Sequence, residues 1–241
     1  MENLIAIIPA RGGSKGLPGK NLLDLHGHPL IAWSILFARE TGKFNRIIVS
    51  TDSSSIRDVS INYKAEAPFL RESSLACDTS PTSDVVVDVI KRCGLANSDV
   101  IVLLEPTSPY RDLGDFMSVH SLFLSDSAEK VMSVSESVSS SYVFQYFRSE
   151  NEKTLSPVLT GGSFVSVRRQ EIPSTYYLDG SFYASTVDAF LQKPGFLDAT
   201  TKTVVSNPLS SLEVDSKFDL EMYRAIFSYF GPPSWYSKKI S

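Results

Sequence analysis

The sequence predicts an α/β protein with a mainly parallel sheet between layers of helices, in a three-layer, Rossmann-like arrangement. Short apolar runs rich in β-branched residues alternate with longer amphipathic stretches through the first half of the chain, which is typical of βα units. The run from Asp99 to Leu104 is almost uniformly apolar, as expected for a central strand that is buried on both faces. With 241 residues, of which 42% are hydrophobic, the chain is long enough to bury one substantial core.

The individual elements follow from local signals. The first strand is predicted from Leu4 to Ile8. Pro29 suits the first turn of a helix because its φ is fixed and its missing N–H needs no partner, and the apolar residues after it give that helix a broad buried face. The other predicted elements are a strand from Arg46 to Ser50, a helix from a Ser-rich cap through about Tyr63, a helix from Asp84 to Cys93, a strand from Thr203 to Val205 and a helix from Ser216 to about Phe230.

The second half of the chain has a different pattern. Between Val131 and Tyr183 the apolar segments are short, aromatic and β-branched, which favours extended arms or hairpins over helices. We therefore predict a core at residues 1–130 and 186–230, an extended arm at residues 131–185, and a peripheral tail at residues 231–241 that Trp235 anchors by burial. Arms of this kind pair with a second copy, so we expect a homodimer.

Composition excludes several classes of protein. The formal net charge is −4, so no overall basic field points to nucleic acid, and a bound anion must meet a local cluster of Lys and Arg. No stretch approaches the roughly 20 apolar residues of a membrane span, and the first residues lack the features of a signal peptide. Cys77 and Cys93 are too few and too far apart for a metal site or a disulfide framework. We expect a cytoplasmic protein that binds neither nucleic acid nor membranes.

A glycine-rich, basic loop follows the first predicted strand. Four glycines allow backbone N–H groups to turn toward a phosphate, and Arg11, Lys15 and Lys20 add positive charge. The spacing fits neither G-x-G-x-x-G nor a P-loop, because Gly19-Lys20 is followed by Asn21. The alternative is a flexible surface turn with solvated lysines. Position favours phosphate binding, because open α/β sheets bind ligands at the carboxyl ends of their strands.

Four blocks of sequence then occur in a fixed order. They are IPARGGSKGLPGKN at residues 8–21, IVSTD at residues 48–52, LEPTSPYR at residues 104–111 and SLEVDSKFDL at residues 211–220. Together they resemble the acylneuraminate cytidylyltransferases, the CMP-sialic acid synthetases and their relatives for other nonulosonic acids, from about residue 3 to residue 228. The resemblance implies a nucleotidyltransferase fold and a reaction in which a sugar hydroxyl attacks the α-phosphorus of CTP and pyrophosphate leaves.

The resemblance also implies roles for individual residues. Arg11 and Lys20 would clamp the triphosphate, and with Asp215 they are the expected catalytic residues. The other residues expected in the nucleotide site are Ala10, Gly12, Gly13, Ser14, Lys15, Asn21, Asp52 and Glu105. The segment at residues 131–185 would serve both dimerisation and sugar binding. The product would belong to nucleotide-sugar biosynthesis for cell-surface polysaccharides.

An acidic pair lies near the end of the resemblance. Glu213 and Asp215 are two residues apart, so in an extended segment their side chains point to the same face and can share a cation. Carboxylates beside a triphosphate suit Mg²⁺, which is the expected cofactor. The family normally has Asp-x-Asp here, so the Glu leaves open whether residue 213 binds the ion directly. The alternative is an acidic cap for the last helix, with Asp219 also favoured by the helix dipole.

Further departures from the family concern the substrates. Glu105 replaces a Gln that helps to read the base, and an ionised carboxylate only accepts hydrogen bonds, which suits guanine better than cytosine. On the sugar side, Tyr177 replaces a basic residue and Asp179 replaces an Asn, so a sugar carboxylate would meet fewer cations. The residues expected to contact the sugar are Arg169, Gln170, Tyr177, Asp179, Gly180 and Tyr183.

These departures keep other functions open. The main prediction is transfer of CMP from CTP to a sialic acid-like nonulosonic acid. One alternative is a guanylyltransferase, or another nucleotidyltransferase, that acts on a sugar 1-phosphate. A nucleotide-sugar glycosyltransferase would also use an acidic-x-acidic motif, but a donor diphosphate needs fewer cations than this loop carries. A nucleotide sensor without turnover is the remaining alternative.

Overall fold

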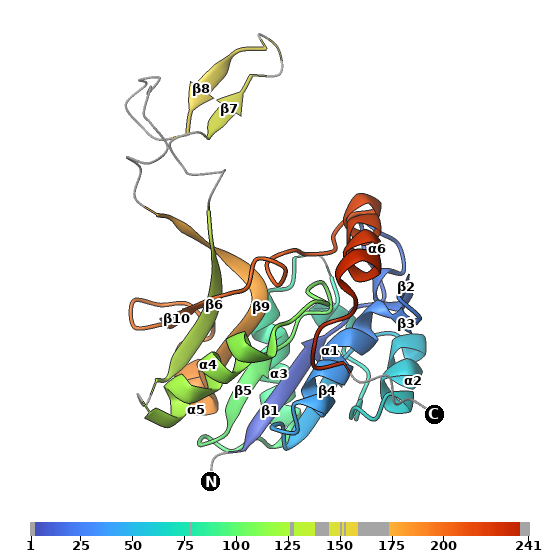
Figure 1. The fold of residues 1–241 in the computed structure, drawn as a ribbon. Helices are drawn as coiled ribbons and strands as arrows, with labels where there is room; N and C mark the ends of the chain where they lie inside the picture. The colour runs from blue at the N-terminus through green and yellow to red at the C-terminus, as the bar shows by residue number, and fades with distance from the viewer. Residues whose placement is uncertain are drawn as a thin grey trace.

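The computed structural model describes residues 3–77, 79–125, 128–137, 145–149, 151, 153–158 and 174–236. Its centre is a six-stranded sheet in the order β10-β6-β9-β5-β1-β4 (Figure 1). β1 runs parallel to both β4 and β5, and β10 runs parallel to β6. β9 is antiparallel to its neighbours β5 and β6. The six strands are β1 (Leu4–Pro9), β4 (Arg46–Ser50), β5 (Val100–Leu103), β6 (Lys130–Glu136), β9 (Tyr176–Thr186) and β10 (Lys202–Val205).

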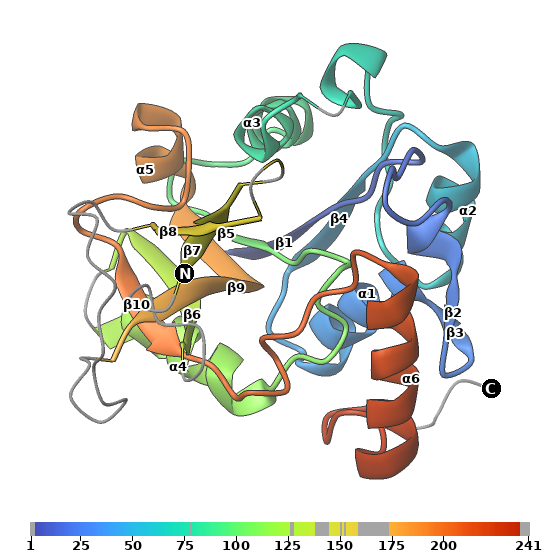
Figure 2. The same ribbon diagram turned by 90° about the horizontal axis from the view of Figure 1, so that it is seen from above.

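Helices cover both faces of this sheet, as Figure 2 shows. On one face lie α1 (Leu30–Glu40), α4 (Leu113–Ser125) and α6 (Lys217–Phe230), and α2 (Ser54–Asn62) packs beside α1. On the other face lie α3 (Thr82–Cys93) and α5 (Val187–Gln192), whose apolar residues pack against Ile5 and Ile7 of β1. The strand residues thus alternate between two separate clusters of buried side chains, one on each face. The predicted α/β class with a mainly parallel sheet is confirmed.

Local sequence signals placed the helix starts well. Pro29 precedes α1, and the residues from Leu30 to Ala38 are all buried, so the predicted broad apolar face exists. Ser53 caps α2, where its side chain accepts a hydrogen bond from the Ile56 N–H. Ser216 and Asp219 form a reciprocal capping box at the start of α6. These helices begin within a residue of the predicted positions because short polar side chains satisfy backbone donors that the first turn leaves free.

The segment predicted as an arm differs from the structure at its ends. β6 and β9 are strands of the main sheet, so the predicted boundaries at residues 131 and 185 fall within or beside strands of the core. Between them, β7 (Tyr146–Arg148) and β8 (Leu155–Pro157) form a small antiparallel hairpin that stands apart from the sheet in Figure 1. The short aromatic and β-branched runs indicated strands correctly, but strand pairing over long sequence separations decides which of them join the core.

The chain after α6 is less peripheral than the sequence predicted. Trp235 is buried, packs edge-on against Phe37 of α1, and donates a hydrogen bond from Nε1 to the Arg111 carbonyl at 2.7 Å. Burial of Trp235 agrees with the predicted anchoring, and Pro233 is buried with it. No helix among the described residues is long and apolar enough to cross a membrane. The cytoplasmic location stays a prediction.

The remaining elements are short. They are β2 (Asp24–Leu25) and β3 (His28–Pro29), which pair with each other, and the 3-10 turns η1 (Lys20–Leu22) and η2 (Ser73–Leu75).

Candidate active site

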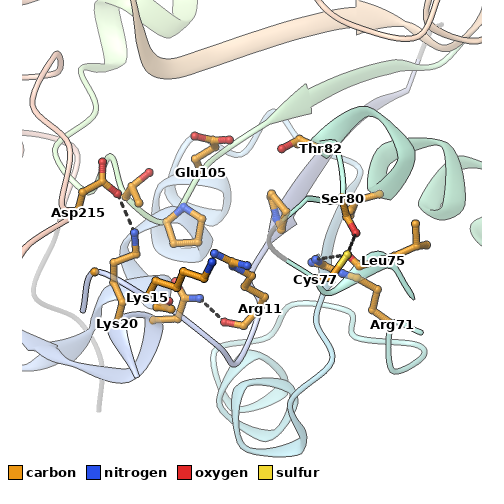
Figure 3. Close-up of a pocket in the computed structure, with 17 residues that line it drawn as sticks. Arg11, Lys15, Lys20, Arg71, Leu75, Cys77, Ser80, Thr82, Glu105 and Asp215 are labelled. Atoms are coloured by element: carbon orange, nitrogen blue, oxygen red, sulfur yellow. Dashed lines mark hydrogen bonds and ion pairs between the residues drawn. The ribbon is translucent and has the colours of Figure 1, made fainter. Parts of the chain in front are cut away.

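A cavity of about 460 Å³ opens where β1 and β5 end (Figure 3). Its walls come from the loop after β1, from the segment before α3, from the residues after β5 and from the segment before α6. Seven residues of the expected nucleotide, catalytic and metal sites line it, namely Arg11, Ser14, Lys15, Lys20, Asn21, Glu105 and Asp215. The carboxyl end of the sheet therefore carries the concave site that the topology predicts.

The glycine-rich loop is fixed to the sheet at its start. The Ala10 N–H donates to the Ser50 carbonyl at 2.9 Å, and the Gly12 N–H donates to Asp52 Oδ1 at 2.8 Å. Ala10 is buried, so it and Asp52 hold the loop in place at the end of β4. Ala10, Gly12, Gly13 and Asp52 are not among the residues that line the cavity. Their expected place in nucleotide binding stays a prediction.

The cations of the loop gather on one side of the cavity. Arg11, Lys15 and Lys20 all line it, and Figure 3 shows their side chains close together. Asn21 is buried and donates from Nδ2 to the Arg11 carbonyl at 3.0 Å, which closes the loop on itself. Lys20 Nζ lies 2.9 Å from Asp215 Oδ1, so a basic and an acidic residue meet across 195 positions of sequence. A polyanion entering here would meet three positive charges.

The acidic segment at residues 213–215 is held by its middle residue. Val214 is fully buried, and its N–H donates to the Thr107 carbonyl at 2.8 Å. Asp215 therefore lines the cavity, while Glu213 lies against Gly180 of β9. Asp219 Oδ2 accepts from the backbone N–H groups of residues 215 and 216. Asp219 therefore caps the start of α6, as one of the carboxylates considered for that role, and the Asp215 carboxylate faces the cavity.

Two glycines make room for this acidic segment. A Cβ on Gly16 would lie 2.7 Å from the Asp215 carbonyl oxygen. A Cβ on Gly180 would lie only 1.9 Å from Glu213 Oε1, and Gly180 also has a left-handed backbone with φ of +73°. Both positions exclude a side chain, and at Gly180 the backbone conformation independently favours glycine. Gly180, which the resemblance assigned to the sugar site, thus also supports a residue of the expected metal pair.

Burial and crowding of negative charge govern the protonation of this region. Burial is the largest cause that raises the pKa of Glu213 to about 7, and the nearby Glu105 and Asp215 raise it further while Lys20 opposes them. Burial also raises the pKa of Glu105, against the lowering effect of Arg111 and Lys20. A divalent cation or an added positive charge would relieve this repulsion.

The expected sugar-side residues other than Gly180 fall into four groups. Tyr183 is half-buried, and its pKa is raised by burial and by the nearby Glu105 and Glu213, which places it at the acidic side of the site. Tyr177 is exposed on β9 and is not a lining residue of the cavity. Arg169 and Gln170 lie outside the described residues.

Asp179 forms the fourth group, because its carboxylate is buried. It is 1% exposed, and its carboxylate accepts hydrogen bonds from the hydroxyls of Ser133 and Ser135 and from the Ser181 N–H. These donors lie on β6 and β9, where the register between the two strands shifts. Three donors satisfy the buried carboxylate, which gives Asp179 a structural role, and its expected sugar contact stays a prediction.

Sequence reasoning missed the wall formed by the segment before α3 and by the first turn of α3. Arg71, Leu75, Cys77, Ser80, Thr82 and Val85 all line the cavity. Arg71 is buried, and its guanidinium donates to the carbonyl and hydroxyl of Ser50, at the end of β4. The only signal was an arginine in the irregular stretch between α2 and α3, which by itself does not separate a buried residue from a solvated one.

Arg111 has a structural role that the motif did not reveal. It is fully buried, and its guanidinium donates to the carbonyls of Glu105 (2.6 Å), Ser108 (2.5 Å) and Ser181 (2.9 Å) and to the Ser34 hydroxyl (2.9 Å). Burial lowers its pKa to about 10. This one side chain fixes the turn after β5 and ties it to β9 and α1, so it sets the direction in which Glu105 leaves the sheet.

Comparisons with known proteins identify a family that this chain resembles along most of its length. The sequence model of a family described as "Cytidylyltransferase" matches residues 5–155, more than half of the chain. The CMP-N,N'-diacetyllegionaminic acid synthase of Legionella pneumophila is 34% identical over 223 residues, which span 90% of this chain and 92% of that protein. The pseudaminic acid cytidylyltransferase of Campylobacter jejuni is 29% identical over 94% of this chain and 97% of its own length.

A solved structure shows the same fold at lower identity. The CMP:2-keto-3-deoxy-manno-octonic acid synthetase complexed with CTP superposes with a TM-score of 0.67 and 19% identity, covering 94% of this chain and 99% of that chain.

Proposed function

Because this chain belongs to the cytidylyltransferase family, we propose that it transfers CMP from CTP to a sialic acid-like nonulosonic acid and releases pyrophosphate. The observation that carries the proposal is the cavity in Figure 3, where three cations of one loop face carboxylates from two distant segments. Such a site can hold a triphosphate and stabilise the charge that develops when pyrophosphate leaves. The relatives named for legionaminic and pseudaminic acids support an acceptor of this class.

The residues of the loop have distinct tasks in this reaction. Arg11 and Lys20 bind the triphosphate oxygens, and Asn21 keeps the Arg11 backbone in place through its 3.0 Å hydrogen bond. Lys20 reaches both the triphosphate and Asp215, so it joins the nucleotide to the acidic side of the cavity. Positioning of this kind lowers the barrier because the reactants meet in the geometry that the attack requires.

We propose Mg²⁺ as the cofactor, held by Asp215 and Glu213. The residues fit the ion because two hard carboxylates lie beside a triphosphate site, where burial and the neighbouring Glu105 and Asp215 raise the pKa of Glu213. When bound, the ion neutralises phosphate charge and makes the α-phosphorus easier to attack. Gly16 leaves room for the Asp215 backbone, and Gly180 leaves room for the Glu213 carboxylate.

We also propose a homodimer. The hairpin and the start of β9 carry exposed large apolar side chains, at Phe147, Leu155, Tyr176, Tyr177 and Leu178. A patch of large apolar residues on extended strands is typical of a protein interface. Light scattering behind size exclusion should give twice the chain mass of 26.6 kDa, and a monomer at micromolar concentration would contradict the proposal.

The function is tested by pyrophosphate release. The purified protein is incubated with each of the four nucleoside triphosphates and Mg²⁺, and with N,N'-diacetyllegionaminic acid, pseudaminic acid, N-acetylneuraminic acid or a sugar 1-phosphate. We expect release with CTP and a nonulosonic acid, and a CMP-sugar by mass spectrometry. Release with GTP and a sugar 1-phosphate would instead establish the guanylyltransferase alternative that Glu105 suggested. Binding of CTP without any release would identify a nucleotide sensor.

A further inference from the structure

Glu105 presents an unpaired carboxylate to the cavity. Its backbone carbonyl accepts hydrogen bonds from Arg111 Nη2 at 2.6 Å and from the Ser34 hydroxyl at 3.2 Å, so the residue is fixed at the end of β5. Within the described part of the chain, no group donates a hydrogen bond to its side chain and no cation lies within 4 Å of it. A largely desolvated carboxylate without a partner is costly, which indicates that a substrate or ion completes the site.

The surroundings of Glu105 locate it within the cavity. Lys20 from the loop and Asp215 from the segment before α6 interact with it on one side, and Arg111 interacts with it from behind. Glu213 and Tyr183, which belong to the expected metal pair and sugar side, are in turn influenced by its charge. Glu105 therefore lies between the triphosphate cations and the residues expected to face the sugar, where the acceptor hydroxyl would meet the α-phosphorus.

This position argues against a contact between Glu105 and the nucleobase. A pyrimidine has two flat apolar faces. Leu75 and Val85 offer apolar side chains on the wall that also carries Arg71 and Ser80, and Pro9 and Pro106 offer them where β1 and β5 end. Figure 3 shows Glu105 between Asp215 and Thr82, with Leu75, Cys77 and Arg71 farther away, beyond Thr82. A carboxylate beside Lys20 and Asp215 is in a position to contact the reacting groups, the acceptor hydroxyl and the α-phosphate.

The reaction needs a group that accepts a proton. The attacking hydroxyl must lose its proton as its oxygen bonds to the α-phosphorus. Among the described residues, Glu105 and Asp215 are the carboxylates that line the cavity, and Asp215 is paired with Lys20 at 2.9 Å and is assigned to the metal. The amide that the family usually has at residue 105 cannot accept a proton, whereas a carboxylate can.

We propose that Glu105 is the general base of the transfer reaction, which makes this inference dependent on the proposed function. The acceptor hydroxyl gives its proton to the Glu105 carboxylate, and the hydroxyl oxygen forms a bond to the α-phosphorus. The bond between the α-phosphorus and the oxygen bridging to the β-phosphate breaks, and pyrophosphate leaves with that electron pair. Burial, which raises the pKa of Glu105, brings it closer to the range in which a base works at neutral pH.

The test compares Glu105→Gln with the unaltered protein. The substitution keeps the shape and removes the ability to accept a proton. We expect kcat to decrease about 100-fold, because removal of a general base costs at least about this factor. KM for CTP and the Mg²⁺ requirement should not change. The unaltered protein should show kcat rising with pH as the base ionises, and the variant should lose that rise. Glu66→Gln, at an ion pair with Arg46 outside the cavity, is the matched control and should keep full activity.

Titration of the neighbouring carboxylates must be separated from that of Glu105. Glu213 and Asp215 also titrate, but a rise in kcat caused by metal binding shifts to lower pH when the Mg²⁺ concentration increases, whereas a rise caused by the base does not. The profiles are therefore recorded at two saturating Mg²⁺ concentrations. A rise that moves with Mg²⁺, or one that persists in Glu105→Gln, would overturn the assignment.

The other outcomes are equally decisive. Glu105→Gln with unchanged kcat would overturn the proposal and leave the proposed function intact. If the activity of Glu105→Gln is restored only by more Mg²⁺, Glu105 is a metal ligand and not a general base. If the variant changes the preference between CTP and GTP, Glu105 reads the base and is not a general base. No pyrophosphate release by the unaltered protein with any acceptor would overturn the proposed function, and this inference with it.

Discussion

The cationic loop at residues 10–21 and the acidic segment at residues 213–215 meet across one cavity, but they are held there in different ways. The loop is fastened to the adjacent strand end, through Ser50 and Asp52, and to itself through Asn21. The acidic segment depends on contacts with Thr107 and on the absence of side chains at Gly16 and Gly180. The comparison shows that one short segment can supply the charges of a site, whereas the geometry of the site depends on residues far away in the sequence.

The largest effect is expected from removing the contact between the two regions. Lys20→Ala removes the cation that pairs with Asp215 and that we expect to hold the triphosphate. We expect kcat/KM for CTP to decrease about 1000-fold, because a charge-assisted contact to the reacting phosphates is lost. Steady-state pyrophosphate release measures it. Lys43→Ala, at an exposed lysine beyond the end of α1, is the control. Equal activities of the two variants would contradict the assigned role of Lys20.

A second experiment breaks only the acidic side. Gly180→Ala places a methyl group 1.9 Å from the position of Glu213 Oε1, so the carboxylate must move. We expect about a 100-fold loss of activity at limiting Mg²⁺, partly recovered at high Mg²⁺, because support of a metal ligand is lost. Titration of kcat against Mg²⁺ measures it.

Gly42→Ala is the matched control for Gly180→Ala. Gly42 has a similar left-handed backbone, with φ of +60°, but a Cβ there would meet nothing within 4 Å. The control should lose about 1 kcal/mol of unfolding free energy from backbone strain and retain its Mg²⁺ dependence. If both variants lose stability alike and neither changes the Mg²⁺ dependence, Gly180 acts through the backbone alone.

The smallest effect concerns the response of the acidic segment to pH. The pKa of Glu213 is raised to about 7, and only the ionised carboxylate binds Mg²⁺, so affinity should increase as pH rises. Between pH 6 and pH 8 we expect the Mg²⁺ dissociation constant to decrease about tenfold, since the ionised fraction rises by about that factor. Calorimetric titration in the presence of a non-hydrolysable CTP analogue measures it. In Glu213→Gln the dependence should disappear, and a flat profile in the unaltered protein would refute the role of Glu213.

Much of the fold could be predicted because its signals are local. The apolar run around Val100–Leu103 is a central strand, Pro29 and Ser216 mark helix starts, and Trp235 anchors the last residues by burial. The joining of β6 and β9 to the main sheet was missed, because the pairing of β9 with β5 links residues about 80 positions apart. A periodicity of two identifies a strand but not its neighbours.

The sequence by itself determined the chemistry of this protein: the glycines and cations of the loop, the acidic pair, and the resemblance that the comparisons confirm. Only the tertiary structure decided which side chains meet. It joined Lys20 to Asp215, turned Asp179 into the sheet, and placed Arg111 behind Glu105. The physical reason is that residue type fixes charge and hydrogen-bonding capacity, whereas burial and distance, which decide what a carboxylate does, arise only when distant segments pack together.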